Sequence, residues 1–341
     1  LTQYPNRAAR KGKRRTRKMT SAGKLKFVIP GDFPPQIQGS AHLERLAPYG
    51  EVTIYTDRPG SMEEQMRRVE GAHVILNTRG AINWFQDSLE HLPELQMIAT
   101  CSIGTDNIDL DAASDRGVVV SNQPGKIAPY VAEHLIGLLF AVAKHAAYQT
   151  TEIKSGRWAP LANTYLRGKT LGVIGTGNTG SEVARIGNAL GMKVIAWTFN
   201  PSPERGRELG VEFVELDDLL RQSDAVTIQV RLSDDSRGML GKREFNLMKP
   251  GALFVNGGRG DLIDTDALVE ALNSGHLGGA GLDVFDPEPP PADHPILKCE
   301  QVVFTPHIAD QTPEGIESLN EGIVSNVIAF LEGQPQNVAN P

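Results

Sequence analysis

Short runs of apolar residues recur along the chain and alternate with longer segments in which apolar positions repeat every three or four residues. The short runs predict strands that are covered on both faces, and the longer segments predict amphipathic helices. The predicted strands of the first third are residues 26–30, 51–55, 73–77, 97–100 and 117–121. A second series begins at residue 171, with predicted strands at residues 171–174, 193–197, 225–230, 252–256, 280–284 and 301–305.

This alternation predicts two α/β units with parallel sheets, the second of which has six strands. A long apolar helix at residues 127–145 is expected to lie between the units and to bridge them. The amphipathic segment at residues 317–333 has no strand after it, so we expect it to return to the first unit. The expected division is a tail of residues 1–23, a first domain of residues 24–122 and 311–336, and a second domain of residues 123–310.

Charge and cysteine content restrict the partners of this protein. The first 18 residues carry eight Lys or Arg and no acid, so the net charge of −7 becomes −15 for the remainder. An acidic body disfavours nucleic-acid binding, and we expect the basic tail to be disordered or non-native, with Met19 as the true start. Glu133 and His134 interrupt the apolar helix, which disfavours a membrane span. Only Cys101 and Cys299 are present, which fits a cytoplasmic protein, and no Cys/His spacing indicates a metal site.

A glycine-rich loop follows the predicted strand at residues 171–174 and begins a helix. Gly175 would permit a tight turn, Gly177 would let the backbone approach a pyrophosphate, and Gly180 would let the helix pack closely on the strand. Asn178 and Thr179 lie at the start of the helix, where free amides and the helix dipole favour phosphate. The loop therefore predicts a dinucleotide cofactor.

The residues after the next predicted strand leave the choice of dinucleotide open. An NAD site commonly has an acid there that holds the ribose hydroxyls, but this chain has Thr198, Phe199 and Asn200. Thr198 or Asn200 could contact either a ribose or a 2′-phosphate. We therefore expect NAD(H) or NADP(H), and we favour NAD(H).

Three further polar stretches follow predicted strands of the second unit, at residues 256–261, 283–290 and 305–308. Ligands collect at such strand ends in open α/β sheets. Arg259 could pair with a carboxylate, a histidine could give a proton to a carbonyl oxygen, and a nearby acid would favour the protonated imidazole. Taken alone, His307 beside an apolar run is more typical of a buried structural histidine. Together these residues indicate a carbonyl substrate that carries a carboxylate.

The chain resembles the D-isomer-specific 2-hydroxyacid dehydrogenase family, which includes glyoxylate and hydroxypyruvate reductases and short phosphoglycerate dehydrogenases. The resemblance rests on the glycine loop and on GTDNIDLDAA (104–113), MKPGALFVNGGRGDLID (248–264), LDVFDPEPP (282–290) and TPHIA (305–309). It implies two Rossmann- or flavodoxin-like domains with parallel sheets and an active-site cleft between them. It also implies an NAD(P)-dependent homodimeric oxidoreductase that interconverts small 2-oxo acids and D-2-hydroxy acids.

Carried over residue by residue, the resemblance assigns roles to individual positions. It implies that Arg259 is the catalytic arginine, that Glu288 orients the histidine and that His307 is the acid/base. The substrate carboxylate would be bound by the backbone amides of Ser102, Ile103 and Gly104. Contacts to the cofactor are implied for three further positions, which are Asp283 near the nicotinamide and Val230 and Arg231 near the adenine.

Several positions depart from the family pattern or have more than one interpretation. Gly257 and Gly258 replace a Thr, Ser or Ala pair, which we expect to loosen the loop before Arg259, and Arg231 stands where many relatives have proline. Arg79, after a strand of the first unit, could reach the substrate or form a surface salt bridge. The family also contains dinucleotide-binding corepressors, so a sensor protein with little turnover is the alternative function.

Overall fold

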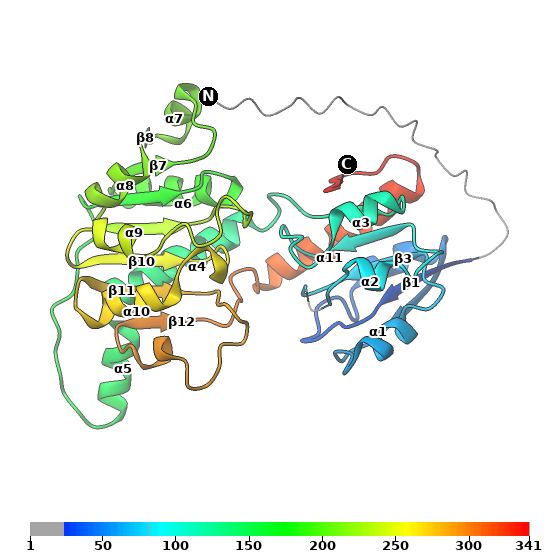
Figure 1. The fold of residues 1–341 in the computed structure, drawn as a ribbon, viewed down its shortest axis with the longest axis horizontal. Coiled ribbons are helices and arrows are strands. Elements are labelled where there is room, and N and C mark those ends of the chain that lie inside the picture. Colours follow the sequence, from blue (N-terminus) through cyan, green and yellow to red (C-terminus); the bar gives the residue numbers. More distant parts are fainter. Residues whose placement is uncertain (1–23, 81, 341) are drawn as a thin grey trace.

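Two α/β units lie side by side in the computed structural model, which describes residues 24–80 and 82–340 (Figure 1). Each unit is built on one parallel sheet, which confirms the predicted fold class. The predicted basic tail, residues 1–23, lies outside the described residues.

The small unit contains a five-stranded sheet in the order β2-β1-β3-β4-β5. Its strands are β1 (Leu25–Ile29), β2 (Gly50–Ile54), β3 (Val74–Asn77), β4 (Met97–Thr100) and β5 (Val119–Ser121). Its helices are η1 (Ala41–Leu46), α1 (Met62–Arg68), α2 (Gln86–Leu89), α3 (Leu110–Asp115) and, from the end of the chain, α11 (Pro313–Leu331). α11 packs against η1 and β4, and beyond it the Ala339 amide donates to the Val120 carbonyl at 2.8 Å. The chain therefore returns to the sheet on which it began.

The large unit contains a seven-stranded sheet in the order β12-β11-β10-β9-β6-β7-β8. Its strands are β6 (Thr170–Ile174), β7 (Lys193–Trp197), β8 (Glu212–Phe213), β9 (Ala225–Ile228), β10 (Ala252–Asn256), β11 (Leu277–Leu282) and β12 (Val302–Phe304). Every predicted strand is present, although its ends shift by up to three residues. The expected count of six was wrong because β8 has only two residues, too few to show a pattern.

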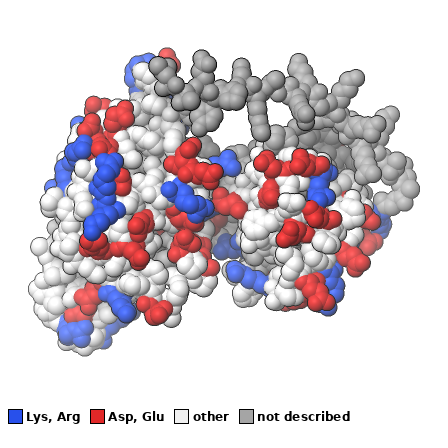
Figure 2. Space-filling view, viewed as in Figure 1, with Lys and Arg blue, Asp and Glu red and all other residues white. Residues whose placement is uncertain are grey.

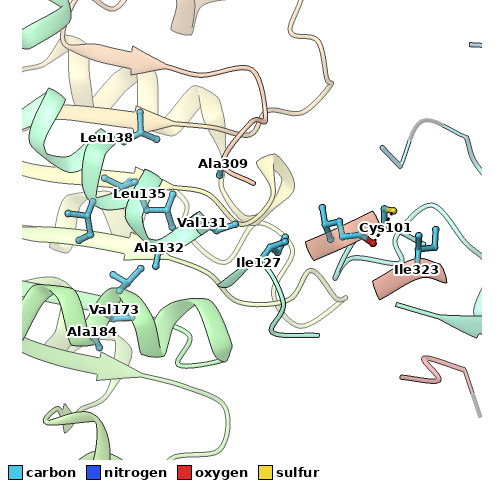
Figure 3. Close-up of a cluster of buried hydrophobic side chains, with 14 of the residues drawn as sticks. Cys101, Ile127, Val131, Ala132, Leu135, Leu138, Val173, Ala184, Ala309 and Ile323 are labelled. Carbon is cyan, nitrogen blue, oxygen red and sulfur yellow. Dashed lines mark hydrogen bonds between the residues drawn. The ribbon is translucent and has the colours of Figure 1, made fainter. Parts of the chain in front are cut away.

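Helices cover both faces of the large sheet, as parallel sheets require. They are α4 (Ala128–Ala143), α5 (Ala146–Lys154), α6 (Asn178–Ala189), α7 (Pro203–Leu209), α8 (Leu216–Gln222), α9 (Lys242–Leu247) and α10 (Thr265–Asn273), with the short η2 (Gly260–Leu262) and η3 (Pro295–Lys298). The long helix α4, expected to bridge the units, instead packs along α6, β10 and β11 of the large unit. Only its beginning reaches across: one buried apolar cluster runs from Leu138 and Val131 through Ile127 to Cys101 and Ile323 (Figure 3).

The strand orders determine where ligands are expected to collect. In each sheet the order reverses once, between β6 and β9 and between β1 and β3, and loops at the carboxyl ends of such strands diverge and leave room for a ligand. The glycine loop follows β6, and Arg79 follows β3. On the face shown in Figure 2, acidic and basic side chains are interspersed over the described parts of both units, without a continuous basic patch.

Candidate active site

The glycine loop joins the end of β6 to the start of α6. Gly175 has a φ of +93°, which favours glycine, and a Cβ on Gly180 would overlap the Gly175 carbonyl oxygen. Gly177 differs, because a Cβ there would point into open space with no described atom within 4 Å. Two of the glycines therefore allow close packing, and the third leaves room for a ligand.

This loop fits the pyrophosphate of a dinucleotide. Gly177 is the N-cap of α6, so the amides of the first helical turn lack partners within the helix. Thr176 is fully buried, and its Oγ1 has no hydrogen-bond partner among the described residues. Asn178 and Thr179 belong to that first turn, and their backbone amides remain the predicted phosphate donors.

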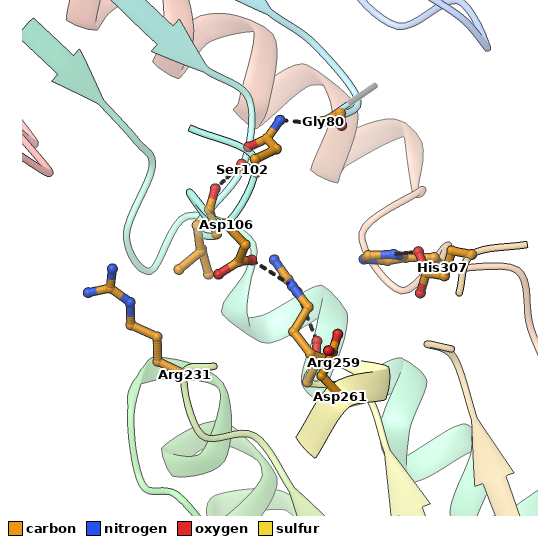
Figure 4. A network of polar contacts seen from close by, with 12 residues as sticks. Gly80, Ser102, Asp106, Arg231, Arg259, Asp261 and His307 are labelled. Atoms are coloured by element: carbon orange, nitrogen blue, oxygen red, sulfur yellow. Dashed lines mark hydrogen bonds and ion pairs between the residues drawn. The ribbon is translucent and has the colours of Figure 1, made fainter. Parts of the chain in front are cut away.

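The residues expected around the adenosine lie at the neighbouring strand ends. Thr198 is half-buried after β7, and Asn200 is exposed. Val230 is buried after β9, and its amide nitrogen lies 2.9 Å from where a Cβ on Gly175 would be. Arg231 is exposed, and its guanidinium points away from Arg259 (Figure 4).

His307 and Glu288 are in direct contact. His307 Nδ1 lies 2.8 Å from Glu288 Oε2, and the Phe285 amide donates to Glu288 Oε1 at 2.9 Å. Burial raises the pKa of Glu288, but the hydrogen bond and charge of His307, the Phe285 amide and the charge of Arg259 outweigh it, so this pKa lies below its ordinary value. The His307 side chain is 46% exposed, which leaves Nε2 accessible and removes the interpretation as a buried structural histidine.

Asp283 holds the loop that carries His307. Its carboxylate is almost fully buried and accepts from Thr305 Oγ1 at 2.6 Å and from the amides of Ile308 and Ala309 at 3.0 and 3.1 Å. Its carbonyl accepts from the His307 amide at 2.8 Å, which supports a φ of +52° at His307, a costly conformation for a residue other than glycine.

A second histidine completes this network. His134 Nε2, on α4, lies 2.9 Å from Thr305 Oγ1 and 3.4 Å from Asp283 Oδ1. Burial raises the pKa of Asp283, but the hydrogen bonds from His134, Thr305 and Ile308 outweigh burial and lower this pKa below its ordinary value. Sequence reasoning missed the contact because 149 positions separate His134 and Asp283, and no local pattern relates them.

Arg259 follows β10 and reaches the small unit. Its Nε donates to Asp106 Oδ2 at 2.9 Å, and its Nη1 donates to the Gly258 carbonyl at 2.8 Å (Figure 4). The Asn256 side chain donates to the Arg259 carbonyl at 2.9 Å and accepts from the Gly258 amide at 3.0 Å. This loop is therefore hydrogen-bonded within itself, and Leu135 fills the space beside Gly257.

The loop after β4 contains Ser102, Ile103 and Gly104, and Gly104 lies against Arg259. A Cβ on Gly104 would overlap Arg259 Nη2, so glycine allows the guanidinium to lie on the loop backbone. Ser102 Oγ donates to the Gly104 carbonyl at 2.6 Å. Within residues 24–80 and 82–340, the amides of these three residues donate to no other group. Three unpaired amides beside a guanidinium form a site suited to a carboxylate.

Arg79 follows β3 in the small unit and lies near Asp310, but it is not a surface residue. Its side chain is 14% exposed, and its Nη1 lies 3.9 Å from Asp310 Oδ1, a long ion pair. Its Nε is buried without a partner in the described part of the chain, and its φ is +59°. The ion pair of the second interpretation is present, but the Arg79 side chain is largely buried rather than on the surface, and substrate contact stays a prediction.

The described residues contain neither a group of metal-binding side chains nor a membrane-spanning helix. No three His, Cys, Asp or Glu side chains of residues 24–80 and 82–340 gather in a geometry that could hold a metal ion. Among the helices of the same ranges, none is both long and apolar enough to cross a membrane.

Comparison with known proteins finds a matching family and similar chains. The family described as D-isomer specific 2-hydroxyacid dehydrogenase, NAD binding domain, matches residues 136–309. A glyoxylate reductase of Thermococcus litoralis is 36% identical over 87% of this chain and 93% of its own length. A hydroxypyruvate reductase of Thermotoga maritima is 40% identical over 75% of this chain and 84% of its own.

A solved structure is similar over nearly the whole length. It is a D-lactate dehydrogenase of Aquifex aeolicus complexed with NAD and lactic acid, 30% identical, with a TM-score of 0.77. The superposition covers 91% of this chain and 96% of that one. The likeness therefore extends to both units and not only to the dinucleotide-binding part.

Proposed function

Because this chain belongs to the D-isomer-specific 2-hydroxyacid dehydrogenase family of NAD(P)-dependent oxidoreductases, we propose that it reduces a small 2-oxo acid to the D-2-hydroxy acid, reversibly, with His307 as acid/base. The observation that carries this proposal is the pair of His307 and Glu288, in contact at 2.8 Å and partly exposed. Relatives named for glyoxylate and hydroxypyruvate support a substrate of two or three carbons.

The dinucleotide binds along the carboxyl ends of the strands of the large unit. The amides of Asn178 and Thr179 would hold the pyrophosphate at Gly177, and Thr198, Asn200, Val230 and Arg231 would contact the adenosine. When bound, the nicotinamide donates or accepts the hydride. The loop that Asp283 anchors would lie beside the nicotinamide.

His307 moves the proton. With Nδ1 donating to Glu288, Nε2 is the atom that gives a proton to the carbonyl oxygen during reduction and removes it during oxidation. The Glu288 carboxylate stabilises the imidazolium and fixes the ring, as a paired acid does for other catalytic histidines.

Arg259 and the amides of Ser102, Ile103 and Gly104 bind the substrate carboxylate. In this position the substrate carboxylate lies between the two units, and the neighbouring carbonyl of the substrate is directed towards His307. Arg79, whose buried Nε lacks a partner among the described residues, contacts the far end of the substrate. Closure of the units on the substrate would then exclude water from the reaction.

The working assembly is a homodimer formed through an apolar arm, residues 153–165. The arm consists of the last two residues of α5 and the segment after it, which runs along the outer edge of the large unit (Figure 1). Trp158 and Tyr165 are 84% and 68% exposed, and Ile153 and Leu161 are exposed as well. A group of large apolar side chains left in water is typical of an interface, and a second copy of this chain is the partner that the family implies.

The substitution His307→Gln tests the proposal. We expect kcat for reduction of a 2-oxo acid to fall by about 10²- to 10⁴-fold, because glutamine cannot deliver a proton, while the affinity for the reduced dinucleotide stays unchanged. His91→Gln, on the surface of the small unit, is the matched control. Equal reduction rates for His307→Gln and the native protein would contradict the assignment.

A further inference from the structure

Asp106 occupies the carboxylate-binding side of Arg259. Asp106 lies after β4 in the small unit, and Arg259 lies after β10 in the large unit, 153 positions later. Arg259 Nε donates to Asp106 Oδ2 at 2.9 Å, and both side chains are about one-third exposed, at 33% and 35%. The pair therefore joins the two units at the surface of the proposed substrate site (Figure 4).

The Asp106 carboxylate lies close to the groups that we assign to the substrate. Asp106 Oδ2 is 2.9 Å from the position that a Cβ on Gly104 would take, and Arg259 Nη2 overlaps that same position. Nε and Nη2 form one edge of a guanidinium, the edge that accepts a carboxylate side-on with two parallel hydrogen bonds. Asp106 uses the Nε half of this edge, so a substrate carboxylate cannot take both donors while Asp106 remains.

We infer that Asp106 is a displaceable internal partner of Arg259, a specificity-determining residue that a substrate carboxylate must replace. This inference rests on the proposed function, because it requires Arg259 to bind the substrate. In the empty site Asp106 compensates the guanidinium. A 2-oxo acid brings its own carboxylate and takes over the pair, whereas a neutral carbonyl compound has no group that can compete with Asp106.

Two physical effects act in the same direction when Asp106 loses its charge. The substrate no longer has to break an existing ion pair, and its carboxylate no longer approaches a fixed negative charge. A partly exposed pair of this kind has a modest net free energy. We therefore expect Asp106→Asn to lower KM for the 2-oxo acid by about three- to tenfold, with kcat changed much less.

The test compares Asp106→Asn, Asp111→Asn and Arg259→Lys with the native protein. The substrate is whichever of glyoxylate, hydroxypyruvate and pyruvate the native enzyme reduces fastest, and binding of oxamate, an unreactive analogue that keeps the carboxylate, is measured by calorimetry with reduced dinucleotide present. Asp111→Asn removes an exposed carboxylate from the nearby first turn of α3 and controls for net charge. Asp106→Ser replaces the asparagine variant if the latter melts at a lower temperature than the native protein.

The inference predicts that removal of Asp106 lowers KM and tightens oxamate binding by the same factor, and that Asp111→Asn changes neither. An unchanged or raised KM in the Asp106 variant that is measured would overturn it, since Asp106 would then be a spectator or would hold Arg259 in its working position. An unchanged KM in Arg259→Lys, or no reduction of any of the three acids, would instead contradict the proposed function itself.

Discussion

At the scale of single residues, Asp283 shows how much the structure adds to a sequence motif. The sequence places this acid beside a strand end, and the family resemblance implies a position near the nicotinamide. The structure adds that its carboxylate bonds Thr305, Ile308 and Ala309, and so shapes the loop that carries His307. A motif records which residues are present, but these bonds depend on a loop conformation that no local pattern specifies.

The ionised form of Asp283 should make stability depend on pH. Its pKa in the folded protein lies below the ordinary value, so its contribution is complete above the unfolded pKa of about 3.9 and is lost as the pH falls through the folded pKa. We expect Asp283→Asn to lower the free energy of unfolding by about 2–4 kcal/mol at pH 7, and this difference to shrink below about pH 4.

Urea unfolding of the native protein and of Asp283→Asn between pH 7 and pH 3 measures how this difference in stability depends on pH. Asp111→Asn, which removes an exposed carboxylate, should show a small difference at every pH. If the free energy of unfolding of Asp283→Asn stayed below that of the native protein by the same amount down to pH 3, the carboxylate charge would not stabilise the loop.

At the scale of elements, the glycine loop could be predicted and β8 could not. The three glycines follow a recognisable strand and begin a recognisable helix. All three lie within six consecutive residues, so a local pattern is enough to find them. β8 has two residues and pairs only with β7 at the edge of the sheet, so tertiary contact alone makes it a strand. The predicted ends of several strands differ from those in the structure for the same reason. The last residue pairs of a strand depend on its neighbouring strand.

Two alanine substitutions in the glycine loop should separate packing from ligand binding. A Cβ on Gly180 overlaps the Gly175 carbonyl oxygen, so Gly180→Ala should destabilise the large unit by about 1–3 kcal/mol. A Cβ on Gly177 has open space, so Gly177→Ala should fold with nearly native stability but bind the dinucleotide more weakly. Thermal melting and fluorescence titration with NADH measure both effects. Equal losses of stability in the two variants would contradict the distinction.

At the scale of the whole molecule, function depends on bringing two sheets together. The sequence predicted both sheets because each follows from local alternation of strands and helices. It could not predict the pair of Asp106 and Arg259, or the buried cluster that continues from α4 into the small unit, since both join segments far apart in the chain. The roles of Arg259, Glu288 and His307 came from family resemblance and stay predictions. The structure adds that Arg259 contacts Asp106 and that His307 contacts Glu288.

The proposed dimer makes a prediction at this scale. Trp158→Ser in the apolar arm should weaken self-association and shift the protein towards the monomer, because Trp158 is the most exposed large apolar side chain of the arm. Light scattering coupled to size-exclusion chromatography measures the mass of each variant. Phe33→Ser, which removes an exposed aromatic from the small unit, is the control. A monomeric native protein would contradict the proposed assembly.

The initial rate at which NADH or NADPH is consumed with glyoxylate, hydroxypyruvate or pyruvate tests whether this protein reduces a small 2-oxo acid. We expect rapid turnover of at least one of these acids. The ratio of rates with the two dinucleotides will show which of them the site prefers with Thr198 in place of an acid. Tight binding of the dinucleotide without turnover of any of the three acids would contradict the assignment of His307, Glu288 and Arg259 to the reduction of a small 2-oxo acid.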